Sequence, residues 1–297
     1  MRQYLVVQVQ YLILHDNNIS GPVPSSLIEC SDLTYLDLSK NKLAGRFPRS
    51  WENLHQMQIM NFSDNYIEGL IPDCFGKMKQ LEVLKLSYNL FQGPIPASIY
   101  NCTSLLKLDL SRNALVGDIH KSICDLRGLE ELILSHNNLT GRIPKKIGKL
   151  KKLKRLCLNN NNLEGKIPAC IGKLVNLKGG LFEPGLDLSY NRLSGEIPPE
   201  IGELDELEHM YLNNNQLEGK LPDTMGNMDN LECLDISYNK LRGRLPHTLN
   251  DCEYLARIIV TGNQWLWTFG CCLPVVYWTR SKPTVIRFDR CYPGTDM

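Results

Sequence analysis

Acids, histidines and cysteines are the residues of this chain that could do chemistry, and their spacing keeps them apart. An Asp-x-Ser pair recurs four times, at Asp37, Asp109, Asp187 and Asp235. A carboxylate beside a hydroxyl can serve acid–base chemistry, but these four pairs fall on four different copies of one repeated phrase. His15, His136 and His209 are equally dispersed, and no Ser or Cys gains a local base. We therefore expect no catalytic site and no enzymatic activity.

The eleven cysteines leave at least one thiol outside any set of internal disulfides. Cys30, Cys102 and Cys252 occupy a column that other copies fill with Leu or Met, which predicts small buried apolar residues. Four cysteines gather toward the C-terminus, namely Cys252, Cys271, Cys272 and Cys291. A capping disulfide and free thiols stay open as alternatives for them. A metal site is disfavoured because no His accompanies them at zinc-finger spacing, so we expect neither metal nor cofactor.

The elements that must position these residues come from a repeat of 24 residues. The phrase LTYLDLSKNKLAGRFP from Leu33 returns as LEVLKLSYNLFQGPIP from Leu81. One anchor asparagine marks each copy: Asn17, Asn41, Asn65, Asn89, Asn113, Asn137, Asn161, Asn191, Asn215, Asn239 and Asn263. The sequence therefore predicts an array of about eleven turns over residues 1–264, with a six-residue insert near 179–184 and a C-terminal capping segment over 265–297.

Each copy predicts a short strand followed by a bend. The stretch LxLxx before the anchor alternates apolar and polar residues, which is typical of a strand with one buried face. The anchor amide can bond backbone groups of its own and the adjacent turn, and the xLxGxIP that follows lets Gly tighten the chain and Pro end the pairing. The predicted fold class is an α/β solenoid with a parallel concave β-sheet and short helical turns on the convex side.

The charge and hydropathy of the chain exclude two kinds of partner. The formal net charge is only +1, whereas a general nucleic-acid binder carries a marked excess of basic residues. No run reaches the roughly 18 apolar residues that span a bilayer. One basic patch, KKIGKLKKLKR from Lys145, is by default a solvated face, with docking onto an acidic partner or lipid surface as the alternative. We expect no nucleic-acid partner and no transmembrane segment in this chain.

The full phrase LxxLxLxxNxLxGxIPxxIGxL, over about residues 9 to 264, resembles the plant-specific class of leucine-rich repeat. This class is known from ectodomains of receptor-like kinases and receptor-like proteins, and from polygalacturonase-inhibiting proteins. The resemblance implies a right-handed superhelix that binds a protein or peptide ligand or a co-receptor, without catalysis, outside the cell or at its surface.

Two other functions stay open. The chain starts without an apolar leader and cleavage site and has an odd number of cysteines, which fits a structural subunit of an intracellular or organellar assembly that packs through its ends. The similarity to polygalacturonase-inhibiting proteins fits an inhibitor of a secreted cell-wall-degrading enzyme. Four sequons, at Asn18, Asn61, Asn101 and Asn138, would accept glycans in a secretory setting.

The residues predicted to contact a ligand lie six, four and two positions before each anchor, because these alternate with the buried leucines. On the concave face they are Tyr11, Ile13, His15, Tyr35, Asp37, Ile59, Val83, Lys85, Lys107, Asp109, Glu131, Arg155, His209 and Tyr211. Apolar groups flanked by polar ones compose the usual centre of a protein contact. Loops that interrupt a solenoid often bind, so Phe182 and Glu183 of the insert are added.

Overall fold

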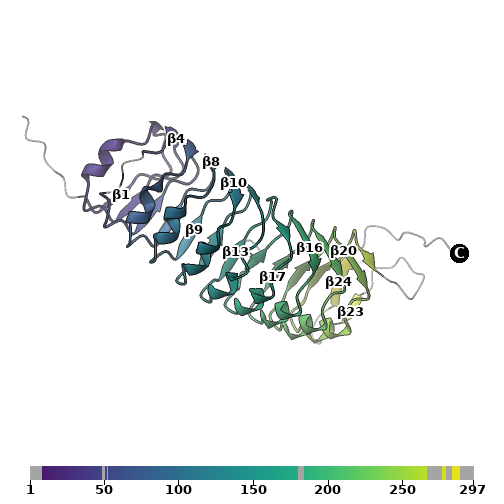
Figure 1. Ribbon diagram of the computed structural model, residues 1–297. Helices are drawn as coiled ribbons and strands as arrows, with labels where there is room; N and C mark the ends of the chain where they lie inside the picture. Colours follow the sequence, from purple (N-terminus) through teal and green to yellow (C-terminus); the bar gives the residue numbers. More distant parts are fainter. Residues whose placement is uncertain are drawn as a thin grey trace, which may run out of the picture. The chain divides into compact units, whose positions relative to one another are not determined.

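The computed structural model describes residues 9–48, 51, 53–179, 184–265, 276–278 and 283–287. The chain forms two compact units, residues 1–140 and 141–297, and each is described by itself. In both units the repeated turn places one strand in a main sheet and one in a lateral sheet, and most turns add a 3-10 helix (Figure 1). The stacked parallel strands confirm the predicted solenoid.

In the first unit, the main sheet is parallel and takes one strand from each successive turn. Its order is β1 (Tyr11–Ile13), β3 (Tyr35–Asp37), β5 (Ile59–Asn61), β7 (Val83–Lys85), β9 (Lys107–Asp109) and β11 (Glu131–Ile133). The lateral sheet holds β2 (Ser20–Gly21), β4 (Lys42–Arg46), β6 (Tyr66–Leu70), β8 (Leu90–Gly93), β10 (Ala114–Asp118) and β12 (Asn138–Thr140); Figure 1 shows β4, β8 and β10 in succession. The 3-10 helices are η1 (Ser25–Glu29), η2 (Asp73–Lys77), η3 (Ala97–Asn101) and η4 (Lys121–Asp125).

The second unit repeats this plan and ends in a hairpin. Its main sheet runs β13 (Arg155–Cys157), β15 (Leu186–Asp187), β17 (His209–Tyr211), β19 (Cys233–Asp235), β21 (Arg257–Ile259), β24 (Pro283–Arg287) and β23 (Val276–Trp278). The lateral strands are β14 (Glu164–Gly165), β16 (Arg192–Glu196), β18 (Gln216–Gly219), β20 (Lys240–Gly243) and β22 (Gln264–Trp265). The 3-10 helices are η5 (Ile147–Lys149), η6 (Ala169–Lys173), η7 (Pro199–Glu203), η8 (Asp223–Asn227) and η9 (His247–Asp251). Strand β24 pairs in parallel with β21, so residues of the predicted capping segment continue the sheet.

The core consists of columns of apolar side chains, one level per turn. Leu36, Leu84 and Leu108, the middle residues of their strands, are fully buried. Burying one such side chain stabilises the fold by about 1.5–3 kcal/mol. Every turn adds a contribution of this kind. In the first unit Phe47 takes the place of the usual Ile before Pro, and its ring packs edge-on 4.8 Å from that of Trp51. Because each level contacts only its neighbours, the array tolerates such local variation.

The anchor asparagines form the predicted ladder. Asn89 is typical: its Oδ1 accepts a 2.9 Å hydrogen bond from the backbone N–H of Ile67, and its Nδ2 donates to the carbonyl of Phe62 at 2.8 Å. One amide thus joins two turns at the bend where each strand ends. The residue before most anchors has a left-handed backbone, with φ of 53° at Tyr88. This bend directs the anchor side chain inward.

Candidate functional site

The main sheet of the first unit carries a row of apolar side chains on its outward face. Tyr11 pairs in register with Tyr35, which pairs with Ile59. Ile59 in turn pairs with Val83. Tyr11 is 65% exposed, and its ring lies 6.2 Å from that of Tyr35. Since paired strands lie about 4.8 Å apart, these four side chains form one strip, called the apolar row below.

The apolar row continues into charged residues along the same line. Val83 pairs in register with Lys107, and Lys107 with Glu131. The Lys107 ammonium lies 2.6 Å from the Glu131 carboxylate. An ion pair this exposed contributes about 0–1 kcal/mol to stability, so it marks the polar end of the strip without rigidifying it.

The other predicted contacts occupy the outward side of main-sheet turns as the spacing rule requires. Ile13 and His15 are exposed in the first turn, whereas Lys85, Asp109 and Arg155 are half-buried in theirs. Their contact with a ligand stays a prediction.

The Asp-x-Ser pairs are structural clasps. Oδ1 of Asp37 accepts a 2.6 Å hydrogen bond from the Ser39 hydroxyl and a 2.9 Å bond from its backbone N–H. The pair that begins at Asp109 repeats both bonds. Asp37 is only 8% exposed. The carboxylate of Asp37 is thus buried and closes the end of its own strand, and its contact with a ligand stays a prediction.

Asn61 takes the place of these aspartates in its turn, and both ends of its amide are engaged. Its Oδ1 accepts a 2.6 Å bond from the Ser63 hydroxyl, and its Nδ2 donates to Asp37 Oδ2 at 3.2 Å. A glycan on Nδ2 would compete with this bond. The other sequon asparagines are exposed, namely Asn18, Asn101 and Asn138, and glycosylation there stays a prediction.

The main sheet of the second unit gathers titratable side chains from neighbouring strands. Asp187 pairs in register with Tyr211, and His209 with Cys233. The polar cluster, as it is called below, consists of Asp187, His209, Tyr211, Cys233, Asp235 and Arg257. His209 and Tyr211 are two of the ligand contacts predicted from the sequence, and the other four are not among those contacts. The same spacing rule reaches them, since they too stand six or four positions before an anchor.

Burial raises the pKa of three groups of the polar cluster, Asp187, Tyr211 and Cys233. It raises the pKa of Tyr211 to about 12 and also raises the pKa of the Cys233 thiol, which lies within hydrogen-bonding reach of the Tyr211 hydroxyl. Burial raises the pKa of Asp187 as well, against the opposing effect of its bonds from Ser189. A nucleophilic cysteine needs the opposite shift. The direction of the shift at Cys233 therefore runs against activation of this thiol.

His209 differs from the expectation of an exposed contact. It is only 3% exposed, and in the described part of the chain its Nδ1 has no hydrogen-bond partner. The large neighbouring ring of Tyr211, 6.4 Å away between centroids, packs beside it. His209 thus belongs to the floor of the cluster rather than to its accessible rim.

The insert begins and ends at adjacent backbone positions, because Gly179 and Pro184 form an isolated antiparallel bridge. The repeat can therefore resume without a change in sheet register. Phe182 and Glu183, the predicted contacts of the insert, lie outside the described residues.

Cysteines of the buried column behave as apolar residues. Cys102 and Cys252 are fully buried, and the Cys252 thiol donates to the Met225 carbonyl at 3.2 Å. Among the described residues Cys252 forms no disulfide, and the choice between a capping disulfide and a free thiol at this position stays open. The other members of the predicted cap cluster, Cys271, Cys272 and Cys291, lie outside the described residues.

These thiols should react slowly with alkylating reagents in the folded protein. Burial raises the pKa of Cys102 and of Cys252 to about 11, from an ordinary value of 9.0. At pH 8 a shift of this size lowers the thiolate fraction about 100-fold, before steric protection is counted. Cys30 of the same column is only partly buried, unlike the prediction for it, so mass spectrometry after iodoacetamide treatment should find Cys30 labelled before Cys102 and Cys252. If iodoacetamide labelled Cys30 and Cys102 at equal rates in the native protein, and not only in urea, this would contradict the burial of Cys102.

The described residues contain neither a membrane-spanning helix nor a group of metal-holding side chains. None of their helices is long and apolar enough to cross a membrane. Nor do three or more His, Cys, Asp or Glu side chains among them come together in a way that could hold a metal ion.

Family models for the leucine-rich repeat match most of the chain. One matches residues 7–67, 45–91 and 55–115, a two-copy model matches 127–178, and a single-repeat model matches 185–204, 206–228 and 230–252. A comparison with curated proteins finds no match.

Solved structures of plant proteins share the fold. The plant peptide hormone receptor RGFR1, in complex with RGF2, is 33% identical with a TM-score of 0.78, over 86% of this chain and 44% of that one. The leucine-rich-repeat ectodomain of the receptor kinase GASSHO1/SCHENGEN3 from Arabidopsis thaliana, in complex with CASPARIAN STRIP INTEGRITY FACTOR 2, is 32% identical with a TM-score of 0.76, over 86% and 33%. A plant ice-binding protein is 28% identical with a TM-score of 0.70, over 86% and 81%.

This chain spans less than half the length of the two receptor structures. Its repeat models and these neighbours agree on one assignment: the chain belongs to the leucine-rich-repeat family, in the form found in plant receptor-kinase ectodomains.

Proposed function

We propose that this chain is a non-catalytic recognition module that binds a peptide or protein on the outward face of its main sheet, with the apolar row of the first unit as the anchoring surface. The observation that carries the proposal is the alignment of four apolar side chains in register, beginning at Tyr11, which is 65% exposed. Ile13, on the same strand as Tyr11, is 54% exposed and adds apolar area beside the row. An exposed apolar strip beside polar groups is typical of contact centres.

The dimensions of the row suit an extended peptide. Three strand steps from Tyr11 to Val83 span about 14 Å, the length of roughly four extended residues. The charged pair Lys107–Glu131 then offers polar contacts to the next residues of the ligand. The two receptor structures of similar fold were solved with RGF2 and with CASPARIAN STRIP INTEGRITY FACTOR 2, which supports a peptide or small protein as the ligand class.

The same resemblance to ectodomains supports a place outside the cell or at its surface. There, a co-receptor or another subunit would meet the chain at its ends. A scaffolding subunit and an inhibitor of a wall-degrading enzyme are the competing functions. Neither would require the apolar row to carry the binding energy, so the row is the feature to test.

Removing the apolar row should weaken ligand binding without unfolding the protein. Peptides selected on the chain from a random phage-displayed library serve as ligands, and their Kd is measured by calorimetry. The triple variant Tyr11→Ala/Tyr35→Ala/Ile59→Ala should bind at least tenfold more weakly, because anchors at a contact centre each contribute about 1–2 kcal/mol. The urea midpoint should change little, since all three side chains are partly exposed.

The matched control removes comparable apolar area from the lateral sheet of the same unit. Tyr66, Leu70 and Leu90 are 57%, 59% and 54% exposed, and their triple alanine variant should keep the Kd within about twofold. Equal losses in both variants, or a loss only in the control, would move the ligand off the main sheet.

A further inference from the structure

Two turns of the second unit carry opposite charges at the same positions of the repeat. Fourteen and fifteen residues after its anchor, one turn exposes Lys151 and Lys152. At the same two positions, a later turn exposes Asp205 and Glu206. The match extends to positions 9, 12 and 17 after the anchors, with lysine in one turn and glutamate in the other: Lys146, Lys149 and Lys154 against Glu200, Glu203 and Glu208. Charge on this flank therefore changes sign without a change of position.

At positions 14 and 15 the turn between these two is uncharged, whereas at positions 12 and 17 it carries Lys173 and Lys178. Its residues at positions 14 and 15 are Val175 and Asn176. Val175 is 44% exposed, an apolar side chain on a charged flank. With strands about 4.8 Å apart, the lysine turn and the acidic turn lie about 10 Å from each other.

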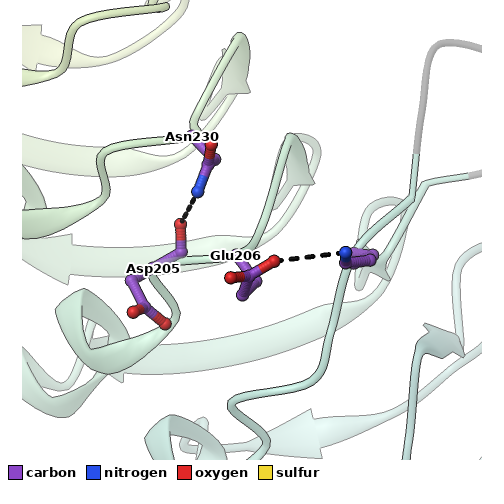
Figure 2. Close-up of polar contacts among 4 residues, drawn as sticks. Asp205, Glu206 and Asn230 are labelled. Carbon is purple, nitrogen blue, oxygen red and sulfur yellow. Dashed lines mark hydrogen bonds and ion pairs between the residues drawn. The ribbon is translucent and has the colours of Figure 1, made fainter.

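Side-chain bonds to the backbone hold this flank in place. Asn176 Nδ2 donates to the carbonyl of Lys151 at 2.6 Å. Two turns on, Asn230 Nδ2 donates to the carbonyl of Asp205 at 2.9 Å, as Figure 2 shows. The same kind of hydrogen bond, from an asparagine amide to a backbone carbonyl, thus fixes the backbone at Lys151 and at Asp205.

Of the four charges at positions 14 and 15, three form no ion pair in the part of the chain that the structure describes, namely Lys151, Lys152 and Asp205. Glu206 pairs with Lys178 at 3.2 Å, with both side chains at least half exposed (Figure 2). Such a pair rearranges at little cost.

We infer that this flank is a self-complementary surface that pairs with a second copy of the chain. A two-fold axis in the contact plane, running along the middle turn, reverses the order of the turns and preserves position within a turn. Lys151 of one copy then faces Asp205 of the other, and Lys152 faces Glu206. Symmetry makes each pairing twice, and Val175 of one copy meets Val175 of the other on the axis. Under this symmetry, residues at the same position of the two outer turns face each other, so they attract only if their charges have opposite signs.

Two lysines of the middle turn oppose the pairing. Lys173 and Lys178 are both exposed, so each copy would place them near their own symmetry mates. Glu206 offsets the charge of Lys178, with which it pairs at 3.2 Å. Replacing Lys173 with alanine should therefore tighten the dimer. The many screened charges also predict a contact that weakens with salt, since the Debye length falls from about 10 Å at 0.1 M to about 4 Å at 0.5 M.

Sedimentation equilibrium of the whole chain tests this dimer. At about 0.05 M salt, wild type should show a monomer–dimer equilibrium whose Kd rises at least tenfold at about 0.5 M salt. The acidic variant Lys151→Glu/Lys152→Glu and the basic variant Asp205→Lys/Glu206→Lys should each be monomeric. Mixed one to one, they should form a heterodimer, and the fourfold variant that combines both changes should dimerise like wild type.

The control Lys240→Glu/Arg242→Glu makes the same charge change at exposed positions of the lateral sheet and should leave the Kd unchanged. Circular dichroism and thermal unfolding verify that every variant is folded. A wild type that stays monomeric at low salt overturns the proposal, as does a mixture of the two monomeric variants that fails to associate. Binding of monomeric wild type to anionic phosphatidylserine vesicles, lost in the acidic variant, would assign the lysines to a lipid surface instead.

Discussion

Replacing Asn89 with alanine should lower the free energy of unfolding by about 3 kcal/mol, because a buried backbone N–H loses its bond to the amide oxygen together with several bonds of the ladder. Asn89 is 6% exposed. Its Oδ1 is the acceptor for Ile67 N–H, at 2.9 Å. The carbonyl of Phe62 keeps a second donor in Asn65 Nδ2, at 3.2 Å. Most of the loss thus comes from the orphaned N–H and the small cavity. Urea denaturation measures it.

Asn17→Ala is the matched control at the exposed first rung of the ladder. Its Nδ2 donates only within its own turn, to the carbonyls of Leu14 and His15, at 3.1 Å and 3.0 Å. Water can replace these bonds, so the loss should stay below about 1 kcal/mol. Equal losses for Asn17 and Asn89 would show that the bonds between turns are not the source of stability.

Gly202→Ala should destabilise the second unit by about 3 kcal/mol, the upper end for overpacking against main chain that cannot rotate away. Gly202 is buried in η7, and an added Cβ would overlap the carbonyl oxygen of Thr224 and lie 2.6 Å from its carbonyl carbon. The Thr224 hydroxyl also donates to the Pro199 carbonyl at 2.6 Å. This bond holds η8 against η7, so the helices cannot separate without breaking it.

Gly128→Ala is the comparison for this prediction. An added Cβ there would meet the Leu105 carbonyl oxygen at 3.6 Å, an ordinary contact. Reduced freedom of the unfolded chain should make the change neutral or stabilising by up to about 1 kcal/mol. Thermal unfolding of both variants decides the matter. A Gly202→Ala protein as stable as wild type would mean that the helices of neighbouring turns can shift apart freely.

The sequence alone determines the structure of one repeat, because the strands and buried columns of each repeat depend on contacts that recur at a fixed spacing. The 24-residue period identifies the buried leucines, the anchor ladder and the strands, and the structure confirms all three through Leu84, Asn89 and the register of β5 with β7. Cys102 could be predicted as buried for the same reason, since its column holds Leu or Met elsewhere. The outward side of each strand likewise follows from alternation.

Only the tertiary structure shows how residues on different turns bury one another and which contacts they make. Asp37 and His209 obey the spacing rule for outward positions, yet neighbouring turns bury them to 8% and 3% exposure. The need for glycine at position 202 arises from a carbonyl 22 residues away, at Thr224. Spacing fixes where a side chain stands in its own turn. Its exposure, charge state and partners depend on the shapes of side chains one turn before and after, which the period does not encode.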